Sequence, residues 1–409
     1  MIRFENIPCQ GVEGLNGTCY TEKECSSRSG LASGACAGGF GVCCIFHVGC
    51  GQTSAENCTY LSTEVVSSHC SYEICMATPT VVLLRLDFTE FNIAQPFTCG
   101  SSSTPVQCTT TDGPLIGDCI YDSMTVTTPG SPAPPVICGY NTGQHMYVEA
   151  SEDCNRITFN FELNKVVDRA WKIKVTQYDS TQDQRFLAPP GCLQWNYGSL
   201  GTVTNFNYKD DNSYHLSSQR YSVCWRRERG KCSLCMSIGT FGMSNLPSTV
   251  QPDPSSPTTT PWTKLAGYTD SICCSADTPQ ANCGTSGAND FIEFQGAKEP
   301  PAASVFTVGD ANRFCGRWLG IASPPTPAPS YTYNANNAAK TICTQVIPYR
   351  MRVHFSDGEV LSSTSANVCG TTSGTAKTND VSDECSKFRL YGNRRGTIGF
   401  KMVWWQADC

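Results

Sequence analysis

The stretch Trp171-Lys172-Ile173-Lys174-Val175 alternates apolar and basic side chains residue by residue. Successive side chains of a β-strand point to opposite faces of a sheet, so this alternation predicts a strand with one buried face. Other short runs, rich in apolar and β-branched residues, are separated by turn residues. They lie at residues 80–88, 124–128, 144–148, 157–163, 222–226, 291–294, 351–355 and 400–405. Sustained helical periodicity is hard to find, and we predict an all-β chain built from β-sandwiches.

Cysteine is the second deciding feature of the sequence, with 27 cysteines in 409 residues. Such a load is typical of proteins from oxidising compartments, where thiols pair into disulfides. We therefore expect a secreted, extracellular protein. Because 27 is an odd number, at least one thiol must be free or bonded to another chain.

Charge and hydropathy argue against two classes of partner. The formal net charge is −6 and the pI is about 5.5, which argues against nucleic acid as a partner. No run of about 18 apolar residues occurs, so we expect no membrane span. The first residues carry no apolar signal-peptide core, and we interpret Met1 as the start of a processed or partial chain.

Residues 1–46 form a block with an even set of cysteines and few large hydrophobic residues. A core of this size does not offset the entropy of the chain, so disulfides must hold the block together. The block resembles a clip domain, the small disulfide knot found next to arthropod cascade proteases, in its Cys19-x5-Cys25 and Cys36-x6-Cys43-Cys44 spacing. This resemblance implies the pairs Cys9–Cys43, Cys19–Cys36 and Cys25–Cys44.

The rest of the chain resembles arthropod CUB-domain proteins. In residues 47–187, Leu84–Phe91 fits the family strand that ends in Phe-x-x-Phe, and Cys119-Ile120-Tyr121-Asp122 fits the Cys-x-x-Asp motif. In residues 188–409, Arg313-Phe314-Cys315-Gly316 fits the Cys-Gly strand. The resemblance implies two CUB-like β-sandwich (jelly-roll) domains. Two stretches rich in Pro, Ser and Thr, residues 247–261 and 322–330, are interpreted as loop insertions in the second domain.

The CUB resemblance also implies part of the disulfide map. It places Cys119–Cys138 across neighbouring strands and pairs Cys50 with Cys70. Cys99–Cys108 could close a short loop, and Cys58–Cys75 would complete four pairs in the first domain. This leaves Cys154 as the candidate for a free or interchain thiol. In the second domain, Cys315 is expected to pair with Cys283, or with Cys274, and Cys369 with Cys385. The partners of Cys343 and Cys409 stay open.

Sites for chemistry are scarce in this sequence. A trypsin-like enzyme needs an activated serine, and no Gly-Asp-Ser-Gly-Gly occurs, so we expect no enzyme and no catalytic residue. Cys232-x-x-Cys235 has zinc spacing but no second cysteine pair follows it. The family resemblance allows calcium as a cofactor, with Asp122, Asp290 and Asp357 as ligands. The first acid of the family site is missing in both domains, where Ala94 and Ser244 stand instead.

Surface features complete the sequence-based expectations. Trp404 and Trp405 are adjacent on an expected strand, so one should be in the core and the other on an outward, interface-forming side. Asn16-Gly17-Thr18 and Asn57-Cys58-Thr59 are glycosylation sequons, with Asn16 and Asn57 as acceptors.

The function we expect is binding. A secreted, non-enzymatic CUB protein would act through other proteins or glycans, and could self-assemble as a homo-oligomer or fibre into an extracellular structure. The alternative is a clip-type cofactor or regulator of an extracellular immune or clotting protease cascade.

Overall fold

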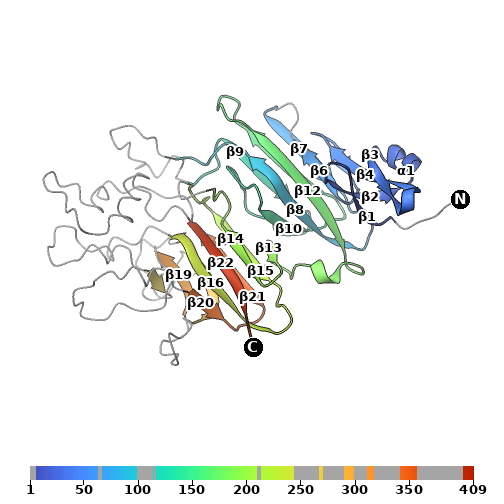
Figure 1. The fold of residues 1–409 in the computed structure, drawn as a ribbon. Helices are drawn as coiled ribbons and strands as arrows, with labels where there is room; N and C mark the ends of the chain where they lie inside the picture. Colours follow the sequence, from blue (N-terminus) through green and yellow to red (C-terminus); the bar gives the residue numbers. More distant parts are fainter. Residues whose placement is uncertain are drawn as a thin grey trace, which may run out of the picture. The chain divides into compact units, whose positions relative to one another are not determined.

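A computed structural model describes residues 6–62, 67–98, 114, 117–209, 213–243, 267–269, 290–298, 311–316, 341–356 and 399–409. Within these residues the regular structure is β-strand, apart from helix α1 (Glu22–Ser27) and two short 3-10 turns (Figure 1). The prediction of an all-β fold is therefore confirmed. In the described part of the chain, no helix is long and apolar enough to cross a membrane.

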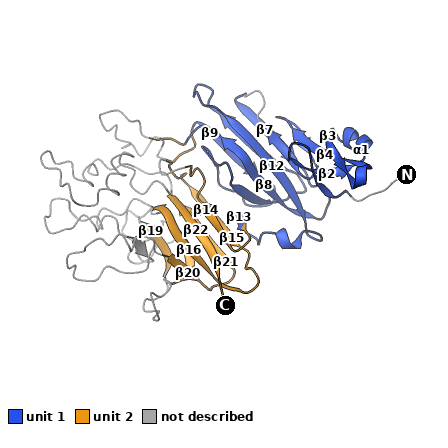
Figure 2. Cartoon of the chain, viewed as in Figure 1, with its two compact units in different colours: residues 1–95, 121–195 blue, residues 96–120, 196–409 orange. Residues whose placement is uncertain are grey.

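The chain forms two compact units (Figure 2). Unit 1 contains residues 1–95 and 121–195, and unit 2 contains residues 96–120 and 196–409. The cysteine-rich block at the N-terminus belongs to unit 1, because strand β4 (Gly41–Val48) continues from the block and pairs in parallel with β6 (Thr59–Ser62). The domain boundaries after residues 46 and 187, expected from the sequence, remain predictions.

Unit 1 contains two sheets. The larger one has the order β1-β2-β4-β6-β12-β8-β10, with β3 also paired to β4, and the smaller one has the order β5-β7-β11-β9. The strands not yet given are β1 (Pro8–Gln10), β2 (Asn16–Tyr20), β3 (Leu31–Cys36), β5 (Thr53–Ser54), β7 (His69–Ile74), β8 (Val81–Asn92), β9 (Asp122–Thr127), β10 (His145–Glu149), β11 (Asn155–Phe161) and β12 (Ala170–Asp179).

The core of unit 1 is built on the alternation of β12. Every second residue from Trp171 to Gln177 is buried, and the lysines between them are half-buried. The Trp171 ring stacks on Phe159, with a centroid distance of 4.7 Å, and its Nε1 donates to Tyr72 Oη at 2.9 Å. A buried indole N–H needs such an acceptor, and this one comes from β7 of the opposite sheet.

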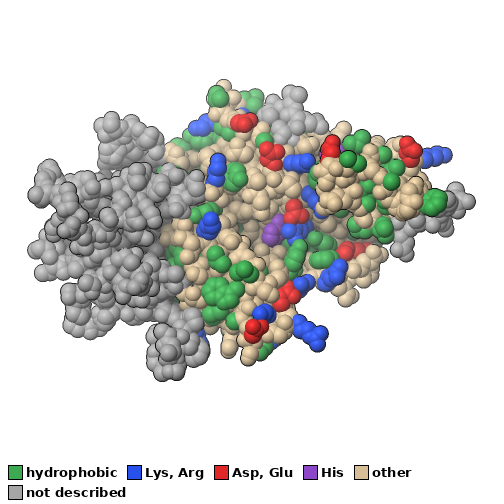
Figure 3. Space-filling view, in the orientation of Figure 1, with side chains coloured by type: hydrophobic (Ala, Val, Ile, Leu, Met, Phe, Trp, Pro, Cys, Tyr) green, Lys and Arg blue, Asp and Glu red, His purple; other side chains and the backbone are tan. Residues whose placement is uncertain are grey.

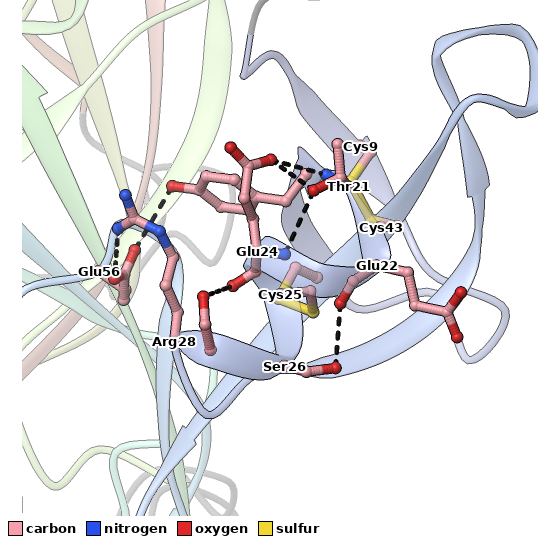
Figure 4. Close-up of a disulfide and its surroundings, with 12 residues drawn as sticks. Cys9, Thr21, Glu22, Glu24, Cys25, Ser26, Arg28, Cys43 and Glu56 are labelled. Carbon is pink, nitrogen blue, oxygen red and sulfur yellow. Dashed lines mark hydrogen bonds and ion pairs between the residues drawn. A yellow bond between two sulfur atoms is a disulfide. The ribbon is translucent and has the colours of Figure 1, made fainter. Parts of the chain in front are cut away.

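The N-terminal knot is held by three disulfides and one short helix (Figure 4). Helix α1 starts with a capping box, in which Glu24 N donates to Thr21 Oγ1 at 3.2 Å and Thr21 N donates to Glu24 Oε2 at 3.1 Å. Arg28, at the end of the helix, pairs with Glu56 at 2.7 Å. The pairs Cys9–Cys43, Cys19–Cys36 and Cys25–Cys44 confirm the pairing that the clip resemblance implied.

Unit 2 also contains two sheets. Their orders are β13-β15-β21-β18-β19-β17 and β14-β22-β16-β20. The strands are β13 (Gln194–Asn196), β14 (Leu200–Thr204), β15 (Gln219–Trp225), β16 (Lys231–Gly242), β17 (Gly267–Thr269), β18 (Phe291–Ala297), β19 (Ala311–Gly316), β20 (Thr341–Thr344), β21 (Tyr349–Phe355) and β22 (Gly399–Asp408). The loop insertions predicted at residues 247–261 and 322–330 lie outside the described residues.

Disulfides outside the knot correct one part of the predicted map. Cys50–Cys70 is confirmed, but Cys75 bonds to Cys154 and not to Cys58. The register explains this pair, because β7 and β11 align Ile74 with Asn155, so the next residues outward, Cys75 and Cys154, face each other. Cys154 is therefore not the spare thiol. Among the described cysteines Cys58 is free and buried, and burial raises the pKa of its thiol.

The remaining cysteines are settled in part. Cys232 bonds to Cys409, and Cys235 bonds to Cys343, which supplies the two partners that the sequence left open. Cys119, Cys138 and Cys315 are disulfide-bonded. The predicted partner Cys283 and the predicted pairs Cys99–Cys108 and Cys369–Cys385 lie outside the described residues.

Candidate functional site

The predicted calcium ligand Asp122 is bound to an arginine. Arg169 Nε donates to Asp122 Oδ2 at 2.7 Å and its Nη2 donates to Asp122 Oδ1 at 2.9 Å. The backbone N–H groups of Ala94 and Glu162 donate to the same two oxygens, at 2.7 and 3.1 Å. The side chains of Asp122 and Arg169 are 0 % and 8 % exposed. The guanidinium thus contacts both carboxylate oxygens of a residue that the family resemblance implied as a calcium ligand.

This arrangement is a bidentate, charge-assisted pair that fixes two strand ends. Asp122 begins β9, and Arg169 stands directly before β12. The hydrogen bond to Asp122 is the main reason why the pKa of the Arg169 guanidinium is raised. Sequence analysis missed Arg169, although a basic residue directly before the Trp171 strand was a signal that could have been used.

The predicted calcium ligand Asp290 lies beside a histidine in unit 2. His215 Nε2 lies 3.1 Å from Asp290 Oδ2, and both residues are buried. The other carboxylate oxygen accepts hydrogen bonds from Ser356 N and Ser356 Oγ, at 2.7 and 2.9 Å. Asp357 lies outside the described residues. Within the described residues, no group of three or more His, Cys, Asp or Glu side chains is placed to hold a metal ion.

The two adjacent tryptophans point to opposite sides of β22, as the alternation predicted. Trp404 is 3 % exposed and lies in the core of unit 2, against Trp225 at 6.1 Å between centroids. Gly201 of the neighbouring strand makes this possible, because a Cβ there would lie 2.7 Å from Trp404 Cζ2. Trp405 is half-buried on the outer side of the same sheet.

The outer side of β14-β22-β16-β20 is a continuous uncharged surface, which we call the uncharged face. The strand registers define it as two rows across the sheet, because directly opposite residues of antiparallel strands share a face. The first row is Leu200, Trp405, Cys235 and Cys343, and the second row is Thr202, Val403, Ser237 and Thr341. Figure 3 shows hydrophobic side chains gathered over β22 and β16.

Exposure and charge distinguish this face from the equivalent surface of unit 1. Leu200 is 69 % exposed and Val403 is 40 % exposed. By contrast, the corresponding sheet of unit 1, in which β6-β12-β8-β10 follow the same order, carries the Arg85–Asp87 ion pair and two lysines of β12, Lys172 and Lys174, on its outer side. Exposed apolar side chains that lie next to one another are typical of interaction surfaces.

The two predicted glycan acceptors differ in accessibility. Asn16 is exposed on β2. Asn57 Nδ2 donates to Gln177 O at 3.1 Å, and its Oδ1 accepts from Cys58 N and Gln177 N, both at 2.8 Å. The hydroxyl residue of that sequon, Thr59, is fully buried. The side chain of Asn57 is therefore part of the fold, and the structure favours Asn16 as the acceptor.

We accordingly predict a single N-linked glycan. Secretion from a host that glycosylates Asn-x-Thr sequons should give one glycan, and Asn16→Gln should remove it, whereas Asn57→Gln should leave it in place. Intact-mass spectrometry before and after enzymatic deglycosylation measures both variants. A glycan that persists in Asn16→Gln and disappears in Asn57→Gln would contradict the prediction.

Comparison with known proteins identifies the family. The family model described as the animal CUB domain matches residues 189–406, which is more than half of the chain. The chain belongs to the animal CUB-domain family. CUB domains are typically extracellular modules for protein interaction and are generally non-enzymatic. The matched CUB region contains both the uncharged face and the Asp290 site.

Three solved structures, two of them described as CUB domains, are similar to the chain at low identity. The CUB1-EGF-CUB2 domain of human MASP-1/3 is 11 % identical, with 85 % of this chain and 98 % of that chain covered and a TM-score of 0.22. The CUB1-EGF-CUB2 domains of rat MASP-1 are also 11 % identical, with 88 % of this chain and 99 % of that chain covered and a TM-score of 0.22. The full extracellular region of zebrafish Gpr126/Adgrg6 is 13 % identical, with 49 % of this chain and 22 % of that chain covered and a TM-score of 0.21. The search of curated proteins found no match to this CUB protein.

Proposed function

We propose that this chain is a secreted, non-enzymatic CUB protein that acts through contacts with other proteins or glycans and associates with copies of itself. We infer that two copies of the chain associate through the uncharged face. Cyclic dimers use the same patch on both subunits, so the patch must complement itself. Within the four strands, the two central rows carry no charged side chain, and Lys298 lies opposite Cys343 at the edge of the first row. Two copies can therefore meet at the centre of this face without desolvating a charge or opposing like charges.

The surrounding electrostatics favour this face over others. The chain has a net charge of −6, so random contacts between two copies are repulsive on average. Along the described strands of this sheet, charged residues border the uncharged face at its ends, with Lys401 at one end and the Lys231–Asp408 pair at the other. The half-buried Trp405, between Leu200 and Cys235, supplies the large aromatic contact that interface centres favour.

The proposal also fits the disulfide pattern. The described free thiol, Cys58, is 9 % exposed, which makes it poorly placed to bridge two chains. Association would therefore be non-covalent in this part of the molecule. Disulfides within the described residues cross-link the knot (Cys9–Cys43), the rest of unit 1 (Cys75–Cys154) and unit 2 (Cys232–Cys409). Such cross-links are typical of proteins that function in extracellular fluids.

Removing two apolar side chains of the uncharged face should weaken self-association strongly. We expect wild-type protein to show concentration-dependent association in sedimentation velocity, and Leu200→Ser with Trp405→Ser to weaken it by about 30-fold or more, as for an interface hot spot. Leu163→Ser is the matched control, because Leu163 is 56 % exposed in unit 1, and it should behave as wild type.

Two results would contradict self-association through this face. One is a wild-type protein that stays monomeric up to high concentration without reductant. The other is a double variant that keeps the wild-type melting temperature and associates as strongly as the wild type.

A further inference from the structure

The turn between β15 and β16 is strongly basic. Residues 226–231 read Arg-Arg-Glu-Arg-Gly-Lys, so four of the six residues are basic and none carries an apolar side chain. Short segments so rich in Lys and Arg are typical of sites that bind polyanions such as heparin. The contacts of the turn show which of these four charges are neutralised and which stay available.

Two of the four cations are neutralised by neighbouring carboxylates. Arg226 Nη2 lies 2.8 Å from Glu228 Oε1, which also accepts a hydrogen bond from Gly198 N at 2.8 Å. Lys231 Nζ lies 2.6 Å from Asp408 Oδ1. Both acidic side chains at the turn are therefore already paired with a cation.

The other two cations, Arg227 and Arg229, are exposed and form no ion pair within the described residues. Arg227 Nε donates to Lys231 O at 2.6 Å, and its Nη2 donates to Cys232 Sγ at 3.6 Å. Both acceptors are uncharged, so these contacts orient the guanidinium without neutralising it. A guanidinium has five N–H donors, and Arg227 therefore keeps donors for an anion.

The turn holds Arg229 at its tip. Lys231 N donates to Glu228 O at 3.1 Å, which closes a four-residue turn with Arg229 and Gly230 at its two central positions. Gly230 has a φ of +80°, as a type II turn has at its third residue. A Cβ on Gly230 would meet no atom within 4 Å, so the tip of the turn is open to solvent.

The C-terminal strand β22 and the residue after it fix this turn. Gln406 Nε2 donates to Arg226 O at 2.8 Å. Cys409 N donates to Gly230 O at 3.2 Å, and Cys409 is bonded to Cys232 at the start of β16. A loop whose shape is set before a ligand arrives loses little conformational entropy on binding.

We propose that this turn binds the anionic groups of an acidic polysaccharide through Arg227 and Arg229. The planar fork of a guanidinium binds two oxygens of a sulfate or a carboxylate at once. A protein partner needs apolar side chains at the centre of its interface, and residues 226–231 have none. A polyanion needs only charge and hydrogen-bond donors. Because the chain as a whole carries a charge of −6, the attraction is local to the turn.

Calorimetric titration of the full chain tests this site. The probes are a sulfated heparin octasaccharide, an unsulfated octagalacturonate and neutral maltooctaose, each measured at low and at high salt. We expect at least one acidic probe to bind, with an affinity that falls as the salt concentration rises, and maltooctaose not to bind. The two acidic probes distinguish a sulfate from a carboxylate as the recognised group.

A pair of substitutions and a matched control assign the binding to the turn. Arg227→Gln with Arg229→Gln should weaken binding of the acidic probe by about tenfold or more, as expected for the loss of charge-assisted hydrogen bonds. Lys23→Gln with Lys165→Gln is the control, because both lysines are exposed in unit 1 and their loss changes the net charge by the same amount. The control should keep the affinity within about twofold, since distant exposed charges are screened by salt. Melting temperatures of both variants verify that they are folded.

Several results would overturn the site. They are no binding of either acidic probe, equal binding of maltooctaose, equal losses in the two pairs of substitutions, or tighter binding of an acidic peptide such as octaglutamate. The proposal specifies the glycan contact of the proposed function and rests on that part of it, but not on self-association. Sedimentation velocity on the same samples separates the two, because a chain that self-associates and binds no acidic probe overturns this site alone.

Discussion

Replacing Cys75 and Cys154 together by serine should lower the free energy of unfolding of unit 1 by about 4 to 5 kcal/mol. The disulfide closes a loop with a sequence separation of 79, and the entropy that a cross-link removes from the unfolded chain grows with the length of the loop. The Cys50–Cys70 bond closes a separation of only 20, so its removal should cost about 3 kcal/mol. Urea denaturation of the two double variants measures both values.

Cys58→Ser is the control for this prediction. It removes the free thiol without breaking a described disulfide, so it should change stability far less than the Cys75, Cys154 variant. Alkylation of the denatured, unreduced protein should label Cys58, and peptide mapping should recover Cys75 linked to Cys154. A labelled Cys154, or a peptide that links Cys58 to Cys75, would restore the map expected from the sequence and contradict the structure.

Arg169→Met should destabilise unit 1 by about 3 to 5 kcal/mol. The substitution leaves the fully buried carboxylate of Asp122 with two backbone N–H donors and no cation, and an uncompensated buried charge is costly. Asp122→Asn combined with Arg169→Met removes the charge as well, so the double variant should recover part of the loss. Thermal and urea denaturation of the two variants measure this coupling.

Arg156→Met is the matched control, because Arg156 pairs with Glu73 at the surface and the two side chains are 59 % and 38 % exposed. An exposed pair contributes little, so this variant should unfold like the wild type. Calcium should also leave the wild-type melting temperature unchanged, since the guanidinium occupies both oxygens of Asp122. A calcium-dependent rise in melting temperature that Asp122→Asn abolishes would show that the cation displaces Arg169.

Local patterns predicted the strands well. The alternation from Trp171 to Val175 specified a strand with one buried face, and the structure buries Trp171, Ile173 and Val175 as expected. The same reasoning placed Trp404 and Trp405 on opposite sides of β22. These predictions succeed because side-chain direction in a strand depends only on the position of a residue in the chain, with a period of two.

Pairings between distant segments were predicted less well. Cys75 was assigned to Cys58 because this pair completed four disulfides in the first domain, whereas the register of β7 and β11 brings Cys75 to Cys154. The arginine that pairs with the expected calcium ligand Asp122 was missed for a similar reason. Arg169 is 47 residues away and reaches Asp122 only because β9 and β12 lie in the two facing sheets of unit 1.

The sequence by itself determined the strand-rich class of the fold and the need for at least one spare thiol, and the resemblance of residues 1–46 to a clip domain implied the disulfide pattern of the knot. The tertiary structure decided which of the described thiols is free, which side chain neutralises Asp122, and which residues form the uncharged face. The physical reason is that strand periodicity and cysteine spacing are local properties of the chain. Surfaces and buried pairs arise when sheet order and register join residues as distant as Leu200 and Trp405.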